Sequence, residues 1–187
     1  MERGFKSRCE NMATGLRREL GLNNADPLPP HDLAEHLDVR ILSLADIPDL
    51  EPEDVDQLLT IDPDSWSAIT ISVDGKEAII TNSSHGGGRP STDIMHELAH
   101  LLLGHEPSAM FYSSEEDIAL RGFSKESEDE ADWLSATLLL PREALVYSRA
   151  NGMNNEEICR VYEVSQRLLR MRFDVTGVNF QFGVRRR

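Results

Sequence analysis

His96, Glu97 and His100 form an H-E-x-x-H motif inside a segment whose residues favour a helix. Residues four apart on a helix lie on one face, so the two imidazoles can bind a single divalent metal ion. Glu97 stands beside the first imidazole and can accept a proton from a water molecule at that ion. The residue types and their spacing therefore predict metal-assisted hydrolysis.

The rest of this predicted helix is apolar and leaves the motif as a single polar stripe. At about 100° per residue, with His96 at zero, His100 falls near 40°, Asp93 near 60° and Glu97 near 100°. The other positions hold Ile94, Met95, Leu98, Ala99 and Leu101–Leu103. A helix that is apolar on most sides is buried, and buried imidazoles and carboxylates are costly unless they are paired or bind an ion. The pattern therefore favours a metal site over two surface histidines.

A catalytic zinc site takes three protein ligands and leaves one position open, so a third ligand is needed. The acidic run from Glu128 to Asp132 in the next predicted helix can supply it. On a wheel, Glu128 and Asp132 share a face and Glu130 points away, roughly 200° from Glu128. We therefore expect Glu128 as the ligand. Asp132 is expected to accept the second N–H of a ligating histidine. Zn²⁺ is the expected ion, with Mn²⁺ or another divalent ion as alternatives.

The surrounding pattern predicts an α+β fold, with helices and strands segregated along the chain. Ile69, Ile71 and Val73 alternate with polar residues before an Asp-Gly turn, which is typical of a hairpin whose second strand is 78–81. Other expected elements are a strand at 39–44 and helices at 6–22, 91–103, 125–140, 155–162 and 165–173. A capping box of Ser127 and Glu130 is expected at the start of helix 125–140, and residues 105–123 give no clear pattern.

Charge is distributed unevenly along the 187 residues, whose formal net charge is −14. Residues 19–148 hold 6 Lys or Arg against 27 Asp or Glu, whereas residues 149–187 hold 8 Arg against 4 acidic residues. The acidic part should repel nucleic acid and attract basic surfaces. Two distant cysteines, no apolar N-terminal segment and only short aliphatic runs predict a cytoplasmic protein without disulfides or a membrane span.

Two signatures together resemble those of the ImmA/IrrE-type metallopeptidases. The first is His96–His100 with its continuation to His105, and the second is the E-x-E-A-D run at Glu128–Asp132, which L-L-L-P follows at Leu138–Pro141. The resemblance extends from about Pro30 to Thr176. Some members of that family carry a further sensor domain after the helical pair, and we expect none in this protein.

The resemblance implies a gluzincin-like site with His96, His100 and Glu128 as ligands and Glu97 as general base. It implies a zincin-like peptidase domain at 1–148 and a helix-turn-helix-like segment at 149–187. It further implies that the substrate is a helix-turn-helix transcriptional repressor, whose cleavage relieves repression. Such a repressor would be basic, which suits the acidic peptidase domain.

Two other functions stay open from the sequence. One is a non-proteolytic, metal-stabilised module that binds a repressor or an antitoxin-like partner. The other is a regulator that binds DNA through its basic C-terminal helices, although the acidic remainder makes direct DNA binding the weaker expectation. A substrate could add as a strand beside residues 78–81. Tyr112, Tyr147 and His105 are candidates for stabilising the oxyanion.

Overall fold

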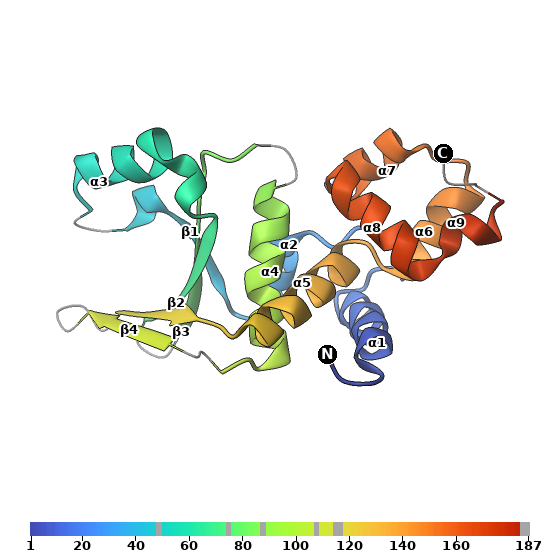
Figure 1. The fold of residues 1–187 in the computed structure, drawn as a ribbon, viewed down its shortest axis with the longest axis horizontal. Helices are drawn as coiled ribbons and strands as arrows, with labels where there is room; N and C mark the ends of the chain where they lie inside the picture. The colour runs from blue at the N-terminus through green and yellow to red at the C-terminus, as the bar shows by residue number, and fades with distance from the viewer. Residues whose placement is uncertain (48–49, 74–75, 87–88, 107–108, 114–117, 184–187) are drawn as a thin grey trace.

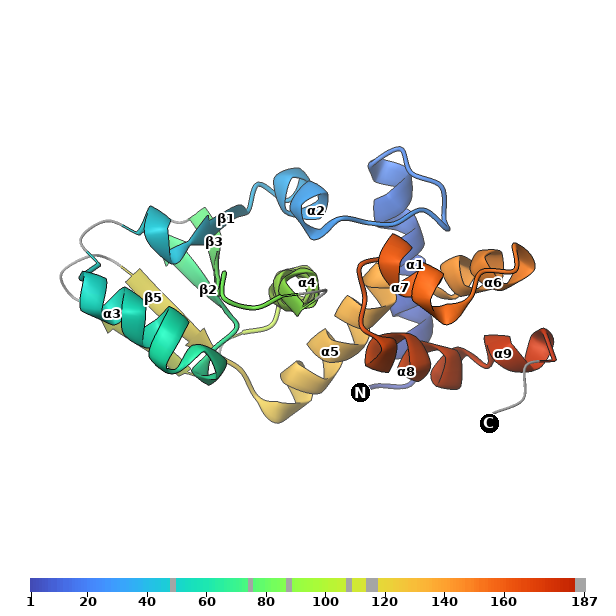
Figure 2. The ribbon, with the colours of Figure 1, turned by 90° about the horizontal axis from the view of Figure 1, so that it is seen from above.

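The computed structural model describes residues 1–47, 50–73, 76–86, 89–106, 109–113 and 118–183, with the side chains of 73, 109–113 and 118–122 excepted. Its mixed α+β architecture confirms the predicted class. A sheet lies at one end of the molecule, two long helices cross the middle, and a group of helices forms the other end (Figures 1 and 2). The middle helices therefore separate the sheet from the helical end.

The sheet has five strands in the order β1-β3-β2-β5-β4. Their bounds are β1 Arg40–Ser43, β2 Ala68–Val73, β3 Lys76–Thr81, β4 Ala109–Ser113 and β5 Ile118–Gly122. The predicted hairpin is confirmed, because β2 and β3 pair antiparallel, while its Asp-Gly turn lies outside the described residues. β1 pairs with β3 in parallel. β4 and β5 pair with each other and lie within residues 105–123, for which no element was predicted.

Strand order overturns one expectation about the substrate. β3 pairs with β1 on one side and with β2 on the other, so residues 78–81 offer no free edge. The prediction that a substrate strand adds there is wrong. The sequence identified the hairpin but could not show that the distant residues 40–43 return to cover its outer strand.

The two central helices are α4, Arg89–Leu103, and α5, Lys125–Leu139, and they pack against each other. α4 also packs on β2 and β3, which explains why most of its surface is apolar. α5 begins one turn earlier than the predicted cap. Its N-cap residue is Ser124, whose hydroxyl accepts a hydrogen bond from the backbone N–H of Ser127, so the predicted box of Ser127 and Glu130 is wrong.

The remaining helices lie around α4 and α5, except for the one at Pro52–Asp56, which lies by the sheet (Figure 1). Their bounds are α1 Phe5–Glu19, α2 Pro30–His36, α3 Pro52–Asp56, α6 Arg142–Ala150, α7 Asn155–Val161, α8 Gln166–Thr176 and α9 Val178–Gln181, with short helical turns at Leu44–Asp46, Gln57–Ile61 and Pro63–Ser65. α6 starts directly after Pro141 and was not predicted. α7 and α8 occupy the predicted C-terminal segments, and their helix-turn-helix character stays a prediction.

One cluster of buried apolar side chains runs from Phe5 on α1 to Val178 on α9. Two buried arginines link helices of this core through hydrogen bonds to carbonyl oxygens at the end of α5. Arg17 donates to the carbonyl oxygen of Leu138 at 2.7 Å, and Arg172 donates to that of Leu140 at 2.8 Å. This core contains residues from both sides of residue 149. The division into domains at 1–148 and 149–187 therefore stays a prediction. Among the described helices, none combines the length and apolarity needed to cross a bilayer.

Candidate metal centre

Three side chains converge between α4 and α5. The Nε2 atoms of His96 and His100 are 3.1 Å apart, as expected for imidazoles one turn apart on α4. Glu128, on the first turn of α5, places one carboxylate oxygen 3.1 Å from His96 Nε2 and the other 3.7 Å from His100 Nε2. All three residues thus offer ligand atoms within 4.8 Å of one another.

These separations suit a single tetrahedral ion. Zinc bonds to nitrogen and oxygen of 2.0–2.2 Å imply ligand atoms roughly 3.3–3.6 Å apart. The two Nε2 atoms are 3.1 Å apart, and they lie 3.1 and 3.7 Å from different oxygens of Glu128, so the contacts are close to that range. The donor set of two imidazoles and one carboxylate also leaves a fourth position open, as catalytic zinc sites do. The residues present therefore fit a catalytic divalent ion.

The outer nitrogen of His96 is held by a carboxylate. Its Nδ1 lies 3.0 Å from Oδ1 of Asp132, one turn beyond Glu128 on α5. Burial lowers the pKa of His96, but the hydrogen bond to Asp132 and the charges of Glu97, Asp132 and Glu128 outweigh it, so this pKa is raised. The same hydrogen bond lowers the pKa of Asp132, which keeps this acceptor ionised.

His100 is in a different environment, because its side chain is only 1% exposed. Burial, reinforced by the neighbouring His96 and His105, lowers the pKa of His100 to about 3. The ring of Phe123 stacks on it with centroids 3.8 Å apart. His100 therefore stays neutral at ordinary pH, which is the form that binds a metal ion.

Glu97 lies beside the three converging residues and faces the sheet. The hydroxyl of Thr70, on β2, donates a hydrogen bond of 2.5 Å to Glu97 Oε2. Burial raises the pKa of Glu97, and the hydrogen bonds from Thr70 and the charge of His96 oppose this without reversing it. A cleft of about 230 Å³ opens here, lined by Ser67, Ala68, Thr92, Asp93, His96, Glu97 and Asp132. Glu97 thus has one oxygen held in place inside a space where a peptide could bind.

Most of the chain is similar to a known protein family. Residues 34–174 match the family described as Peptidase_M78, the IrrE N-terminal-like domain. The chain belongs to this family. The match agrees with the resemblance that the two signatures indicated, and it suggests a metallopeptidase. No curated protein matched the chain.

Within this Peptidase_M78 domain, the sequence reasoning missed what supports His100. His105 Nδ1 lies 3.0 Å from His100 Nδ1, and His105 Nε2 lies 3.5 Å from Glu130 Oε2. The wheel correctly turned Glu130 away from the converging ligands, but it could not show that a residue beyond the helix would meet it. The available signal was Gly104, a glycine directly after the predicted helix 91–103, which returns the chain toward His100.

The candidates for oxyanion stabilisation receive no support from their positions. Tyr147 lies on α6 with a 54% exposed side chain, away from the residues that line the cleft. His105 faces Nδ1 of His100, on the side opposite the nitrogen that faces Glu128. The side chain of Tyr112 lies outside the described part of the structure.

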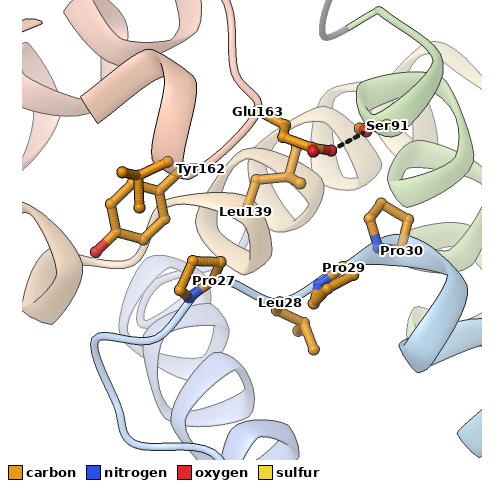
Figure 3. Close-up of a pocket in the computed structure, with 9 residues that line it drawn as sticks. Pro27, Leu28, Pro29, Pro30, Ser91, Leu139, Tyr162 and Glu163 are labelled. Carbon is orange, nitrogen blue, oxygen red and sulfur yellow. Dashed lines mark hydrogen bonds between the residues drawn. The ribbon is translucent and has the colours of Figure 1, made fainter. Parts of the chain in front are cut away.

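A second cavity, of about 180 Å³, lies between the start of α4 and the turn that joins α7 to α8 (Figure 3). Most of its lining is apolar: Pro27, Leu28, Pro29, Pro30, Leu139, Val161 and Tyr162. Ser91 donates a hydrogen bond of 3.3 Å to Glu163 across its rim. The turn between the C-terminal helices α7 and α8 therefore contacts the helix that carries the H-E-x-x-H motif, at its other end from His100.

Proposed function

We propose that this protein is a zinc-dependent endopeptidase in which His96, His100 and Glu128 bind the metal and Glu97 is the general base. The observation that carries the proposal is the convergence of these three ligand atoms beside a buried carboxylate with a raised pKa. A purely structural zinc site would need a fourth protein ligand and no adjacent base. The Peptidase_M78 match supports the same reaction class.

A bound zinc ion would polarise the scissile carbonyl and acidify the attacking water. Glu97 accepts a proton from that water as its oxygen adds to the carbonyl carbon. It then delivers the proton to the amide nitrogen as the carbon–nitrogen bond breaks, which leaves a carboxylic acid and an amine; the acid then passes its proton to the amine. Because Thr70 holds Oε2, Oε1 of Glu97 is the oxygen free to exchange the proton.

We propose that the substrate pairs with the first half of β2, because β3 is covered on both sides. In the described residues, β5 pairs with β2 only at Ile71 and Ser72. Asn82 donates to the carbonyl oxygen of Ser67 on the β3 side, so by alternation the backbone of Ala68 faces the other way. Ser67 and Ala68 also line the cleft beside Glu97. A substrate strand can therefore pair with Ala68 and present its next peptide bond to Glu97.

The proposed substrate is a basic helix-turn-helix repressor, whose cleavage in the cytoplasm relieves repression. Charge supports this choice, because an acidic segment leads directly into β2. Glu51, Glu53, Asp54 and Asp56 around α3, and Asp62 and Asp64 after it, are all exposed. Such a surface speeds the encounter with a basic partner and becomes less effective as salt rises.

The test incubates the purified protein with zinc and with a basic helix-turn-helix protein encoded beside its gene. New N-termini should appear and should be abolished by a chelator. Glu97→Gln should retain zinc and lose cleavage by at least about 100-fold, since general base catalysis contributes that much. Glu126→Gln, an exposed change on α5, is the control and should cleave normally. A stable, uncut complex with the zinc-loaded protein would instead support the non-proteolytic module.

A further inference from the structure

The end of α4 is built so that His105 lies against His100. Gly104 adopts a left-handed φ of 64°, and its N–H donates to the carbonyl oxygen of Leu101 at 3.1 Å. The N–H of His105 donates to the carbonyl oxygen of His100, also at 3.1 Å. This pair of bonds is a Schellman motif, in which the second residue past the helix folds back onto the residue five before it. Here that contact joins two imidazoles.

The proton positions along this contact follow from the metal site. If Nε2 of His100 binds the ion, the neutral ring must carry its proton on Nδ1. That N–H points at Nδ1 of His105, 3.0 Å away, which must therefore be an acceptor. The proton of neutral His105 is then on Nε2, directed at the Glu130 carboxylate 3.5 Å away. Each ring nitrogen has one consistent role.

Burial makes this chain of contacts necessary for His100. Its side chain is 1% exposed and stacked under Phe123, so water has little access to Nδ1. A buried N–H without an acceptor is costly. The side chains of His105 and Glu130 are only 10% and 16% exposed, and the amino group of Met1 lies 4.0 Å from Glu130. By contrast, the partner of His96, Asp132, is 75% exposed, where water can replace it.

We propose that His105 and Glu130 are positioning residues that hold His100 in the tautomer and orientation required for metal binding. This inference rests on the proposed function, because it takes His100 as a metal ligand. It assigns to Glu130 a role distinct from that of Glu128. The two carboxylates of one acidic run would then serve the metal site from opposite sides, one directly and one through two imidazoles.

The test compares two substitutions of the full-length protein at one position. His105→Phe keeps a ring against His100 but removes the acceptor, and should weaken zinc binding about 10–100-fold in competition with a chromophoric chelator. His105→Asn places its side-chain oxygen where Nδ1 stood, and should lose less than about tenfold. A role in packing alone predicts the reverse order, since Phe is the closer match in shape.

Glu130→Gln gives a second, independent measurement. It should weaken zinc binding about tenfold, at the lower end of the 10–100-fold range for such outer contacts. The exposed Glu126→Gln on the same helix should bind zinc as the wild type does. Two-bond ¹⁵N–¹H spectra of the metal-free protein should show His100 protonated on Nδ1. That signature should be lost in His105→Phe.

The outcomes separate this inference from the proposed function. Wild-type protein that binds zinc and cleaves, together with a His105→Phe variant that binds zinc within about twofold of it, overturns the inference alone. Wild-type protein that binds no zinc overturns both. If His105→Phe does not fold when metal-free, as judged by thermal unfolding, Glu130→Gln and the tautomer of wild-type His100 decide. A wild-type Nε2–H tautomer would contradict the inference.

Discussion

The two histidines of the motif should contribute unequally to the pH dependence of zinc binding. The pKa of His96 is raised above its ordinary value of 6.5, whereas that of His100 is lowered to about 3. A metal ion must displace any proton on the nitrogen it binds. Below the raised pKa of His96, zinc therefore competes with one proton from this pair, and His100 offers none until strongly acidic pH.

The size of the effect follows directly. One displaced proton costs about 1.4 kcal/mol, or tenfold in affinity, for each pH unit below the pKa. Between about pH 6.5 and pH 5 the zinc dissociation constant should rise about 30-fold. Two histidines with ordinary pKa values near 6.5 would each contribute about 16-fold over the same interval, or about 270-fold together. Zinc affinity falls as pH falls, because His96 becomes protonated below its raised pKa and the proton competes with zinc for the same imidazole.

Competition with a chelator calibrated at each pH measures this slope. Calorimetry in buffers with different ionisation enthalpies counts the protons released on binding, and we expect one from the pair. Asp132→Asn is the matched variant. It removes the hydrogen bond that raises the pKa of His96, so the fall in affinity should begin at lower pH while its slope stays at one proton. A slope of two protons in the wild type would refute the assignment of different environments to His96 and His100.

Three further changes test other parts of the structure. Thr70→Val removes a donor that lowers the pKa of Glu97, so the acidic limb of the cleavage profile should move to higher pH; an unmoved limb would contradict this control of Glu97 by Thr70. Ala68→Pro removes an N–H from the open edge of β2 and should raise KM with zinc affinity unchanged, whereas an unchanged KM would place the substrate elsewhere. Arg172→Met leaves Glu10 and the Leu140 carbonyl without their buried donor and should lower the free energy of unfolding by about 3 kcal/mol, which urea denaturation measures.

Local pattern was sufficient to predict the elements that carry the ligands. Helical periodicity places His96 above His100, and it separates Glu128 from Glu130 on α5, because both relations depend only on residues within two turns of one helix. The pairing of β2 with β3 was equally local. The order of the whole sheet was not, since it depends on β1 and β5, which are far away in the sequence. The expected substrate edge at 78–81 failed for that reason.

The side chains that contact His96 and His100 from behind show the same difference between what local sequence predicts and what depends on tertiary packing. The sequence placed Asp132 on the face of α5 shared with Glu128, and the structure brings it to His96. His105 could not be assigned in this way, because its position depends on the left-handed residue Gly104 and on how α4 packs against α5. A helix wheel places only residues within a helix, and His105 lies two residues beyond the end of α4.

The acidic residues between Glu128 and Asp132 on α5 therefore contact different parts of the candidate metal centre. Glu128 faces the Nε2 atoms of His96 and His100, Asp132 lies against the outer nitrogen of His96, and Glu130 lies against His105 behind His100. Loss of Glu128 removes a proposed ligand, whereas loss of Asp132 or Glu130 leaves all three ligands and weakens the hold on one imidazole. The E-x-E-A-D spacing permits this arrangement, because residues 128 and 132 share one face of α5 and residue 130 reaches the end of α4 from the other.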